Sequence, residues 1–248
     1  MATQRSLARP PIREAIIEIN SEPREFSRIT EFKDQVADRF PRCKPFRLSS
    51  VAFALPDYSD DGEGGSRQIG WRCESEDGSE VLLLRTDGFA IARLAEYPGW
   101  DGFLARFSAL WDPYQACVQP AEINRVSLRY VNDLRLPIRG AVDFSGYLTT
   151  LPRVPPGLPA ACSDFLMQLT IPSGTDGVSV NVTQASDANG RTDTELPVVI
   201  DIDVYSDRLH DSDPRLSERL AGALTEMREI KNRVFFGLIT DRLADCYQ

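Results

Sequence analysis

The sequence has 248 residues, of which 42% are apolar and 26% charged, which is the composition of an ordinary globular protein with enough interior for a core. Its formal net charge is -9, so non-specific binding to nucleic acid or to a membrane surface is disfavoured, because both of those partners are anionic. Since no apolar run approaches the roughly 20 residues that a membrane-spanning helix needs, we expect a soluble protein.

We expect residues 1–120 to form the first of two α+β halves. Apolar residues alternate with polar ones along Ile12–Asn20, which is the period of a half-buried strand. Glu22–Phe40 carries apolar residues at helical spacing and is followed by Pro41, so we expect a helix there. The other elements expected in this half are strands at Leu48–Leu55 and Gln68–Glu74, a three-stranded meander from Gln68 to Leu94 with Asp-Gly turns, and a helix over Pro98–Trp111 that Asp112-Pro113 ends or breaks.

The stretch at the midpoint, Glu122–Pro137, is the segment around which the prediction is organised. One face of an extended chain would carry Val126, Leu128, Tyr130, Leu134 and Leu136. The opposite face would carry Arg125, Ser127, Arg129, Asp133 and Arg135. This alternation predicts a strand with one buried and one polar face, which opens the second half, residues 121–248.

The second half repeats the element types of the first. The elements expected here are a short helix at Phe144–Leu151 and strands at Phe165–Ile171, Val178–Val182 and Pro197–Tyr205. A helix is predicted to begin at Ser212-Asp213-Pro214, where a capping side chain precedes a proline at the first helical position. Its apolar stripe consists of Leu216, Leu220, Leu224, Met227 and Ile230. Thr240 is positioned to cap a final turn.

The order strand, helix, antiparallel strands, helix therefore occurs twice, which predicts an α+β fold with two pseudo-repeats packed as one globular unit. We expect the halves to join into one continuous curved antiparallel sheet with helices on one face. The arrangement resembles the saddle of TATA-binding proteins or a helix-grip cup. That likeness concerns shape and implies no function.

Three segments resemble the landmarks of a bacterial family. They are PPIREAIIEI near the start, RVSLRYVN in the midpoint strand and FFGLITDRL near the end. Over its whole length the chain resembles a sporadically distributed family of uncharacterised bacterial proteins of about this size. The resemblance implies a patchy spread of the kind seen for defence-linked genes, and it carries over no catalytic residue.

Residue counts and missing motifs disfavour several chemistries. The cysteines are scattered, form no CxxC motif and follow no segment that resembles a signal peptide, so we expect reduced thiols in a cytoplasmic protein. They are Cys43, Cys73, Cys117, Cys162 and Cys246. His210 is the only histidine, which excludes histidine-based zinc motifs, and we expect it in a surface loop. Neither a P-loop nor a GxGxxG motif is present, so no cofactor is predicted.

Two groups of polar residues are candidate sites. Asp201 and Asp203 share one face of a strand and could offer oxygen ligands to Mg²⁺, although a solvated or ion-paired face is the commoner meaning of this pattern. The second group, the arginine lane, consists of Arg125, Arg129 and Arg135, which could hold an anionic ligand or an acidic protein segment. The alternative, which we favour, pairs these arginines with Asp133, Asp201, Asp203 or glutamates on neighbouring strands, at about 0.2–1 kcal/mol per pair.

Three functional hypotheses follow. The leading one is a non-enzymatic binding or interaction protein with a protein partner, an accessory of a bacterial defence-type or toxin–antitoxin-type gene cassette. The second is a receptor for a small anionic ligand in a cup between the sheet and the C-terminal helix, lined by Tyr130, Trp71 or Trp100 with a few arginines. The third is a metal-dependent hydrolase or nuclease that uses Asp201 and Asp203. A homodimer is compatible with each, whereas nucleic acid and membranes are not expected partners.

Overall fold

The computed structural model describes all residues except 50–65, 95, 139–143, 158–163, 188–189 and 208–215. The strands are β1 (Ile12–Glu22), β2 (Arg42–Ser49), β3 (Ser66–Glu74), β4 (Glu80–Arg85), β5 (Gly88–Arg93), β6 (Ala121–Pro137), β7 (Leu166–Pro172), β8 (Val178–Ser186) and β9 (Glu195–Ser206). The helices are α1 (Phe26–Gln35), α2 (Trp100–Val118), α3 (Leu216–Leu238) and α4 (Asp241–Ala244), with 3₁₀ turns η1 (Phe144–Gly146) and η3 (Asp245–Tyr247).

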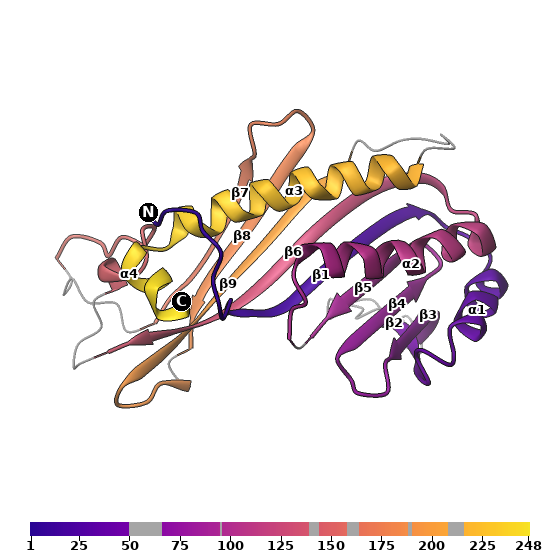
Figure 1. The fold of residues 1–248 in the computed structure, drawn as a ribbon, viewed down its shortest axis with the longest axis horizontal. Coiled ribbons are helices and arrows are strands. Elements are labelled where there is room, and N and C mark those ends of the chain that lie inside the picture. The colour runs from indigo at the N-terminus through magenta and orange to yellow at the C-terminus, as the bar shows by residue number, and fades with distance from the viewer. Residues whose placement is uncertain (50–65, 95, 139–143, 158–163, 188–189, 208–215) are drawn as a thin grey trace, which may run out of the picture.

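All nine strands form one antiparallel sheet in the order β2-β3-β4-β5-β1-β6-β9-β8-β7. Helices α1, α2 and α3 lie on one face of this sheet (Figure 1). The expected α+β fold, a continuous curved antiparallel sheet with helices on one face, is confirmed. The internal repeat stays a prediction, because the helix expected near the start of the second half is only the short turn η1.

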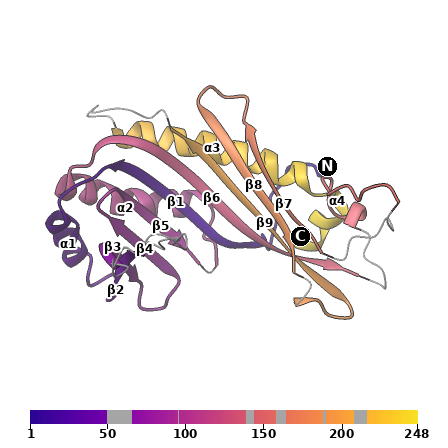
Figure 2. The same cartoon turned by 180° about the vertical axis from the view of Figure 1, so that it is seen from behind.

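Strands β1 and β6 form the centre of the sheet, where Ile17 lies opposite Leu128 in the antiparallel register. The faces predicted for β6 are those observed. Val126, Leu128 and Tyr130 are fully buried, whereas the side chains of the arginine lane lie on the face without helices. Figure 2 shows that face, with the strands in front of α3.

Helix α2 is longer than the sequence predicted, because it continues through Pro113 for another turn and a half. The continuation buries Tyr114, whose ring packs edge-on against Phe32 of α1 at 5.2 Å between centroids, and it also buries Val118. A proline inside a helix removes one hydrogen bond and crowds the preceding turn. Here the packing of Tyr114 and Val118 outweighs that cost. The local sequence does not reveal this packing.

Two predictions about β2 and its cysteine are corrected. The strand begins at Arg42, six residues before the predicted start, because Pro45 is tolerated on an edge strand whose outer side needs no backbone donor. The pairing of β2 with β3 sets Cys43 opposite Cys73, with 4.0 Å between Cα atoms, and the two form a disulfide. The expectation of reduced thiols was therefore wrong for this pair. Cytoplasmic location stays a prediction, and the disulfide is the observation that weighs against it.

The two ends of the chain meet at the C-terminal end of α3. The N-terminal arm, residues 1–11, donates backbone hydrogen bonds from Ala2 to the carbonyls of Phe236 and Ile239, and from Arg9 to Tyr247. The predicted cap at Thr240 is confirmed, since its side chain accepts a hydrogen bond at the start of α4. None of the described helices is long and apolar enough to cross a membrane.

Some predictions lie outside the described residues. They are most of the strand Leu48–Leu55, the helix start at Ser212-Asp213-Pro214, and the surroundings of His210 and Cys162.

Candidate functional site

A cavity of about 650 Å³ opens between the N-terminal arm, the connection from β5 to α2, strand β6 and helix α3. We call it the arm cavity. Its lining residues are Gln4, Arg5, Ser6, Leu7, Ala8, Pro10, Pro11, Ile12, Tyr97, Pro98, Gly99, Trp100, Asn132, Arg228, Lys231, Asn232, Phe235 and Phe236. This volume lies within the range of small-molecule sites, and the lining combines aromatic rings with several polar and charged side chains.

Lys231 belongs to the apolar stripe that α3 turns toward the sheet. Leu220, Leu224 and Met227, which are buried, precede it at intervals of four, three and four residues, so helical geometry places its side chain over the same face. The ammonium nitrogen lies 4.1 Å from the centre of the Tyr130 ring of β6. Within the described part of the chain, Lys231 forms no hydrogen bond and no ion pair.

The environment of Lys231 favours its neutral form. Burial, reinforced by the nearby Arg228 guanidinium and opposed by a smaller effect of Glu229, lowers the pKa of the amine from 10.5 to about 7. A buried ammonium loses hydration that only a carboxylate or a hydrogen-bond acceptor replaces. The Tyr130 ring attracts the cation but supplies neither. A bound anion would supply the negatively charged hydrogen-bond acceptor that Lys231 lacks.

A pair of tyrosine hydroxyls adjoins the amine. Tyr97 Oη and Tyr130 Oη are 2.7 Å apart, and the two rings pack edge to face with centroids 5.5 Å apart. Burial raises the pKa of both phenols, so both hydroxyls remain protonated at neutral pH. They therefore offer a proton-donating hydrogen bond beside a nitrogen that can be neutral.

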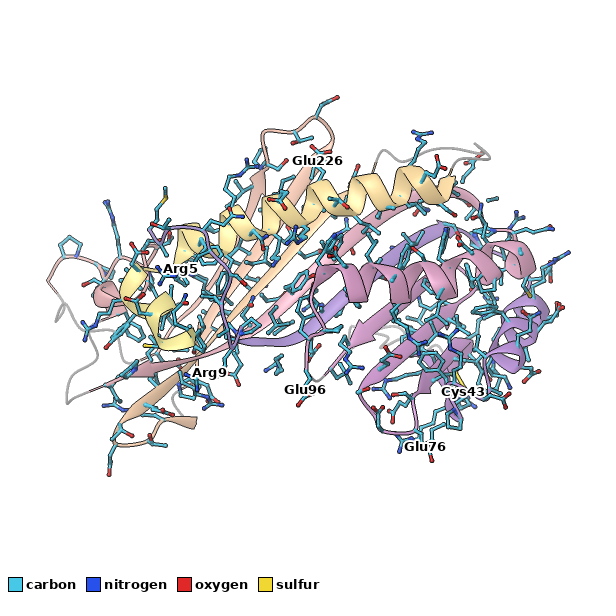
Figure 3. All side chains as sticks on the ribbon, in the orientation of Figure 1. Arg5, Arg9, Cys43, Glu76, Glu96 and Glu226 are labelled. Carbon is cyan, nitrogen blue, oxygen red and sulfur yellow. A yellow bond between two sulfur atoms is a disulfide. The ribbon has the colours of Figure 1, made fainter. Side chains whose placement is uncertain are left out.

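Two arginines add positive charge to the cavity. Arg5, which Figure 3 labels where the arm passes the end of α3, is held by Asp241 and Asp245. Arg228 forms an ion pair with Glu229 at 2.8 Å, and its guanidinium carbon lies 5.8 Å from the centre of the Trp100 ring. None of the described residues that line the arm cavity is acidic, although the whole chain carries a net charge of -9. The cavity is thus a local site of positive charge on an acidic protein.

The structure brings the residues of the arginine lane together with aspartates. Arg125 donates to Asp203 and Asp207, each at 3.1 Å. Arg129 holds Asp201 through two bonds of 2.9 and 2.5 Å, and Arg135 pairs with Asp133 at 3.1 Å. The pairs lie on the face without helices, so each guanidinium already faces a carboxylate. This arrangement matches the alternative in which the arginines form ion pairs within the protein instead of holding a ligand.

A smaller cavity of about 390 Å³ lies over Arg129, Asp201 and Asp203 on the same face. Burial raises the pKa of Asp203, an effect that Arg125 and Arg129 oppose, and Oδ1 of this residue has no hydrogen-bond partner among the described residues. The described residues contain no group of three or more His, Cys, Asp or Glu side chains that could hold a metal ion. In the structure, Asp201 pairs with Arg129 and Asp203 pairs with Arg125.

Sequence reasoning named some of the cavity residues and missed the central one. Trp100 lines the arm cavity and Tyr130 lies beneath Lys231, whereas Trp71 is far along the sheet, where its indole nitrogen donates to Thr30 of α1. Lys231 was missed, although its place on an apolar helical stripe was a readable signal. No family model and no curated protein matches the chain, so the site is interpreted from its own geometry.

Proposed function

We propose that the protein binds a small organic anion with an apolar body in the arm cavity. The carrying observation is Lys231, a half-buried side chain whose amine has no carboxylate partner in the described structure, in a cavity whose described lining includes two arginines and no acid. A carboxylate or phosphate group would pair with Lys231 and Arg228, because charge-assisted hydrogen bonds are the strongest available there. The rings of Trp100 and Phe235 would cover the apolar part of the ligand.

Benzoate and phenyl phosphate are suitable first probes, with benzamide as a neutral analogue of the same shape. Isothermal titration calorimetry should detect binding of at least one anion and much weaker binding of benzamide. Lys231→Met and Arg228→Gln should each weaken that binding about tenfold or more, since a hydrogen bond to a charged group contributes about 1.5–3 kcal/mol. Lys44→Met on β2, at the opposite edge of the sheet, serves as the matched control and should bind like the unaltered protein.

Three results would overturn this function. The first is equal binding of benzoate and benzamide, because the cavity would then not distinguish an anion from a neutral molecule. The second is an affinity for the anion that Lys231→Met leaves unchanged. The third is failure of both anions to bind.

A second candidate function, protein binding, is favoured by the edge strand β7. Leu166, Leu169 and Ile171 of this strand are 70%, 37% and 40% exposed, none of its seven residues is charged, and its one proline, Pro172, is its last residue. Natural edge strands are usually guarded by charges or proline. The opposite edge, β2, is guarded in this way by Lys44, Pro45 and two arginines. We propose that a second copy of the chain pairs with β7 about a two-fold axis, since an uncharged strand meets no repulsion from its own copy.

Sedimentation velocity tests this pairing directly. The protein should dimerise with rising concentration, and Leu169→Lys should keep it monomeric by placing like charges across the two-fold axis. Leu48→Lys on β2, where the leucine is 61% exposed, is the matched control and should still dimerise. A monomer at every accessible concentration would refute the pairing.

The role as an accessory of a defence-type or toxin–antitoxin-type cassette stays a prediction, which the identity of the flanking genes tests. The metal-dependent hydrolase that uses Asp201 and Asp203 is the weakest of the three hypotheses, because Arg129 and Arg125 occupy these carboxylates. Calorimetry with Mg²⁺ and Mn²⁺ tests it.

A further inference from the structure

Lys231 is one of only three lysines in a chain with 28 basic residues. Lys33 pairs with Asp34 at 2.7 Å, and Lys44 is exposed on the edge strand β2. Arg5 and Arg228 supply the guanidinium groups of the arm cavity, and each of them has an acidic partner. A lysine differs from an arginine in one chemical respect that matters here, because only its amine can lose a proton in a protein and act as a nucleophile.

The groups around the amine and the cavity that it borders come from four parts of the structure. Arg228 and Glu229 neighbour it on α3, Tyr130 lies beneath it on β6, Tyr97 approaches from the connection between β5 and α2, and Arg5 belongs to the arm. Burial and the charge of Arg228 lower the pKa of Lys231 to about 7, against a smaller opposing effect of Glu229. At neutral pH a large fraction of the amine is therefore unprotonated while it borders a cavity of ligand size.

We propose that Lys231 forms an imine with the carbonyl carbon of a small anionic aldehyde or 2-oxo acid bound in the arm cavity. The proposal rests on the anion-binding function, since Arg228 would hold the acid group while the carbonyl carbon meets Nζ. Nζ attacks that carbon, and the carbonyl electron pair moves to the oxygen. Nitrogen gives up its two protons and the oxygen leaves as water, so one amine and one carbonyl become one imine and one water. No oxidant or reductant takes part.

The hydroxyl pair of Tyr97 and Tyr130 suits the dehydration step. Loss of water requires a proton on the departing oxygen, and both phenols remain protonated at neutral pH because burial raises their pKa. Their 2.7 Å hydrogen bond lets one hydroxyl restore the proton that the other donates. None of the described residues that line the arm cavity has an acidic side chain that would stabilise the amine as an ammonium ion.

Trapping with sodium cyanoborohydride tests the proposal on the full chain, with pyruvate and glyoxylate as probes near pH 7. Intact-mass measurement should show one reduced adduct per chain, and peptide mapping should place it on Lys231. Labelling there should be about a hundredfold or more faster than at Lys44, because the neutral fraction of an amine rises about tenfold for each unit by which its pKa falls. Lys231→Arg should abolish the adduct, while Lys33→Arg should retain it.

An adduct spread evenly over Lys33, Lys44 and the terminal amine, or no adduct with either probe, would overturn the imine. Benzoate binding, measured on the same preparation, separates the two proposals. If benzoate binds and no adduct forms, the imine alone is refuted. If benzoate and phenyl phosphate also fail to bind, the anion-binding function is refuted as well. The peptide map of the unaltered protein carries the test even where Lys231→Arg fails to fold.

Discussion

Replacement of Lys231 by methionine should stabilise the folded protein, and the gain should depend on pH. The variant keeps the length of the side chain and its contact with the Tyr130 ring but removes the amine. In the folded protein the pKa of this amine is about 7 instead of 10.5. At about 1.36 kcal/mol for each unit of pKa, the protonated amine costs the folded state on the order of 3–5 kcal/mol, after about 1 kcal/mol is subtracted for the attraction of the ring.

The direction of the pH dependence follows from where the proton is held. Between pH 7 and 10.5 the unfolded chain keeps a proton on Lys231 that the folded chain has released, so the stability of the unaltered protein rises with pH through this window. Below pH 7 the amine is protonated in both states, so its full destabilising effect on the folded state remains. The advantage of Lys231→Met should therefore be largest near pH 6 and should shrink by about 2–3 kcal/mol at pH 9.

Urea unfolding followed by tryptophan fluorescence at both pH values measures this difference, with Lys44→Met as the exposed control. The control should differ from the unaltered protein by the same small amount at both pH values. If Lys231→Met shows a constant difference across the range, or is less stable than the unaltered protein at pH 6, the amine is not deprived of solvation as the structure implies.

Three further changes should alter stability in defined ways. Gln184→Met should add about 1–2 kcal/mol in urea unfolding, because both polar atoms of this buried amide lack a partner among the described residues, and a loss would reveal a partner. Dithiothreitol should lower the free energy of unfolding of the unaltered protein by about 3–4 kcal/mol, because reduction of the disulfide opens a 30-residue loop. It should leave the stability of Cys73→Ser unchanged, and an equal response of both proteins would contradict the disulfide. Hydrogen bonds from Ser75 and Ser79 lower the pKa of Asp77 to about 2, so its stabilising effect should be complete above pH 4 and fall as the pH drops through 2. Melting temperatures of Asp77→Asn should lack this acid-induced component, and parallel pH profiles for the two proteins would rule it out.

The charged side chains on the two faces of the sheet have different partners. On the face without helices, Arg125 and Arg129 meet aspartates of the adjacent strand β9, Arg135 meets an aspartate of its own strand, and the charges cancel locally. Under the arm, Lys231 meets an aromatic ring and a cavity. Ion pairs that are satisfied within the protein have little left to offer a ligand, whereas an unpaired buried amine gains most from one. This contrast is why the arm cavity, and not the arginine lane, supports the proposed function.

Patterns that depend only on neighbouring residues were read correctly from the sequence. The alternation in Glu122–Pro137 gave both faces of β6, because side chains of a strand point to opposite sides whatever lies beside it. The Asp-Gly turns gave the meander of β3, β4 and β5 for a similar reason, since Gly78 adopts the positive φ that such a turn requires.

What the sequence alone determined was the α+β class, the faces of the central strand and the ion-paired character that we favoured for the arginine lane, since each rests on local periodicity or on charges a strand apart. Only the tertiary structure decided the passage of α2 through Pro113, the pairing of Cys43 with Cys73, and the position of Lys231 beneath an arm from the other end of the chain. Each of these depends on residues that are distant in sequence, whose register and packing free energy no local pattern contains.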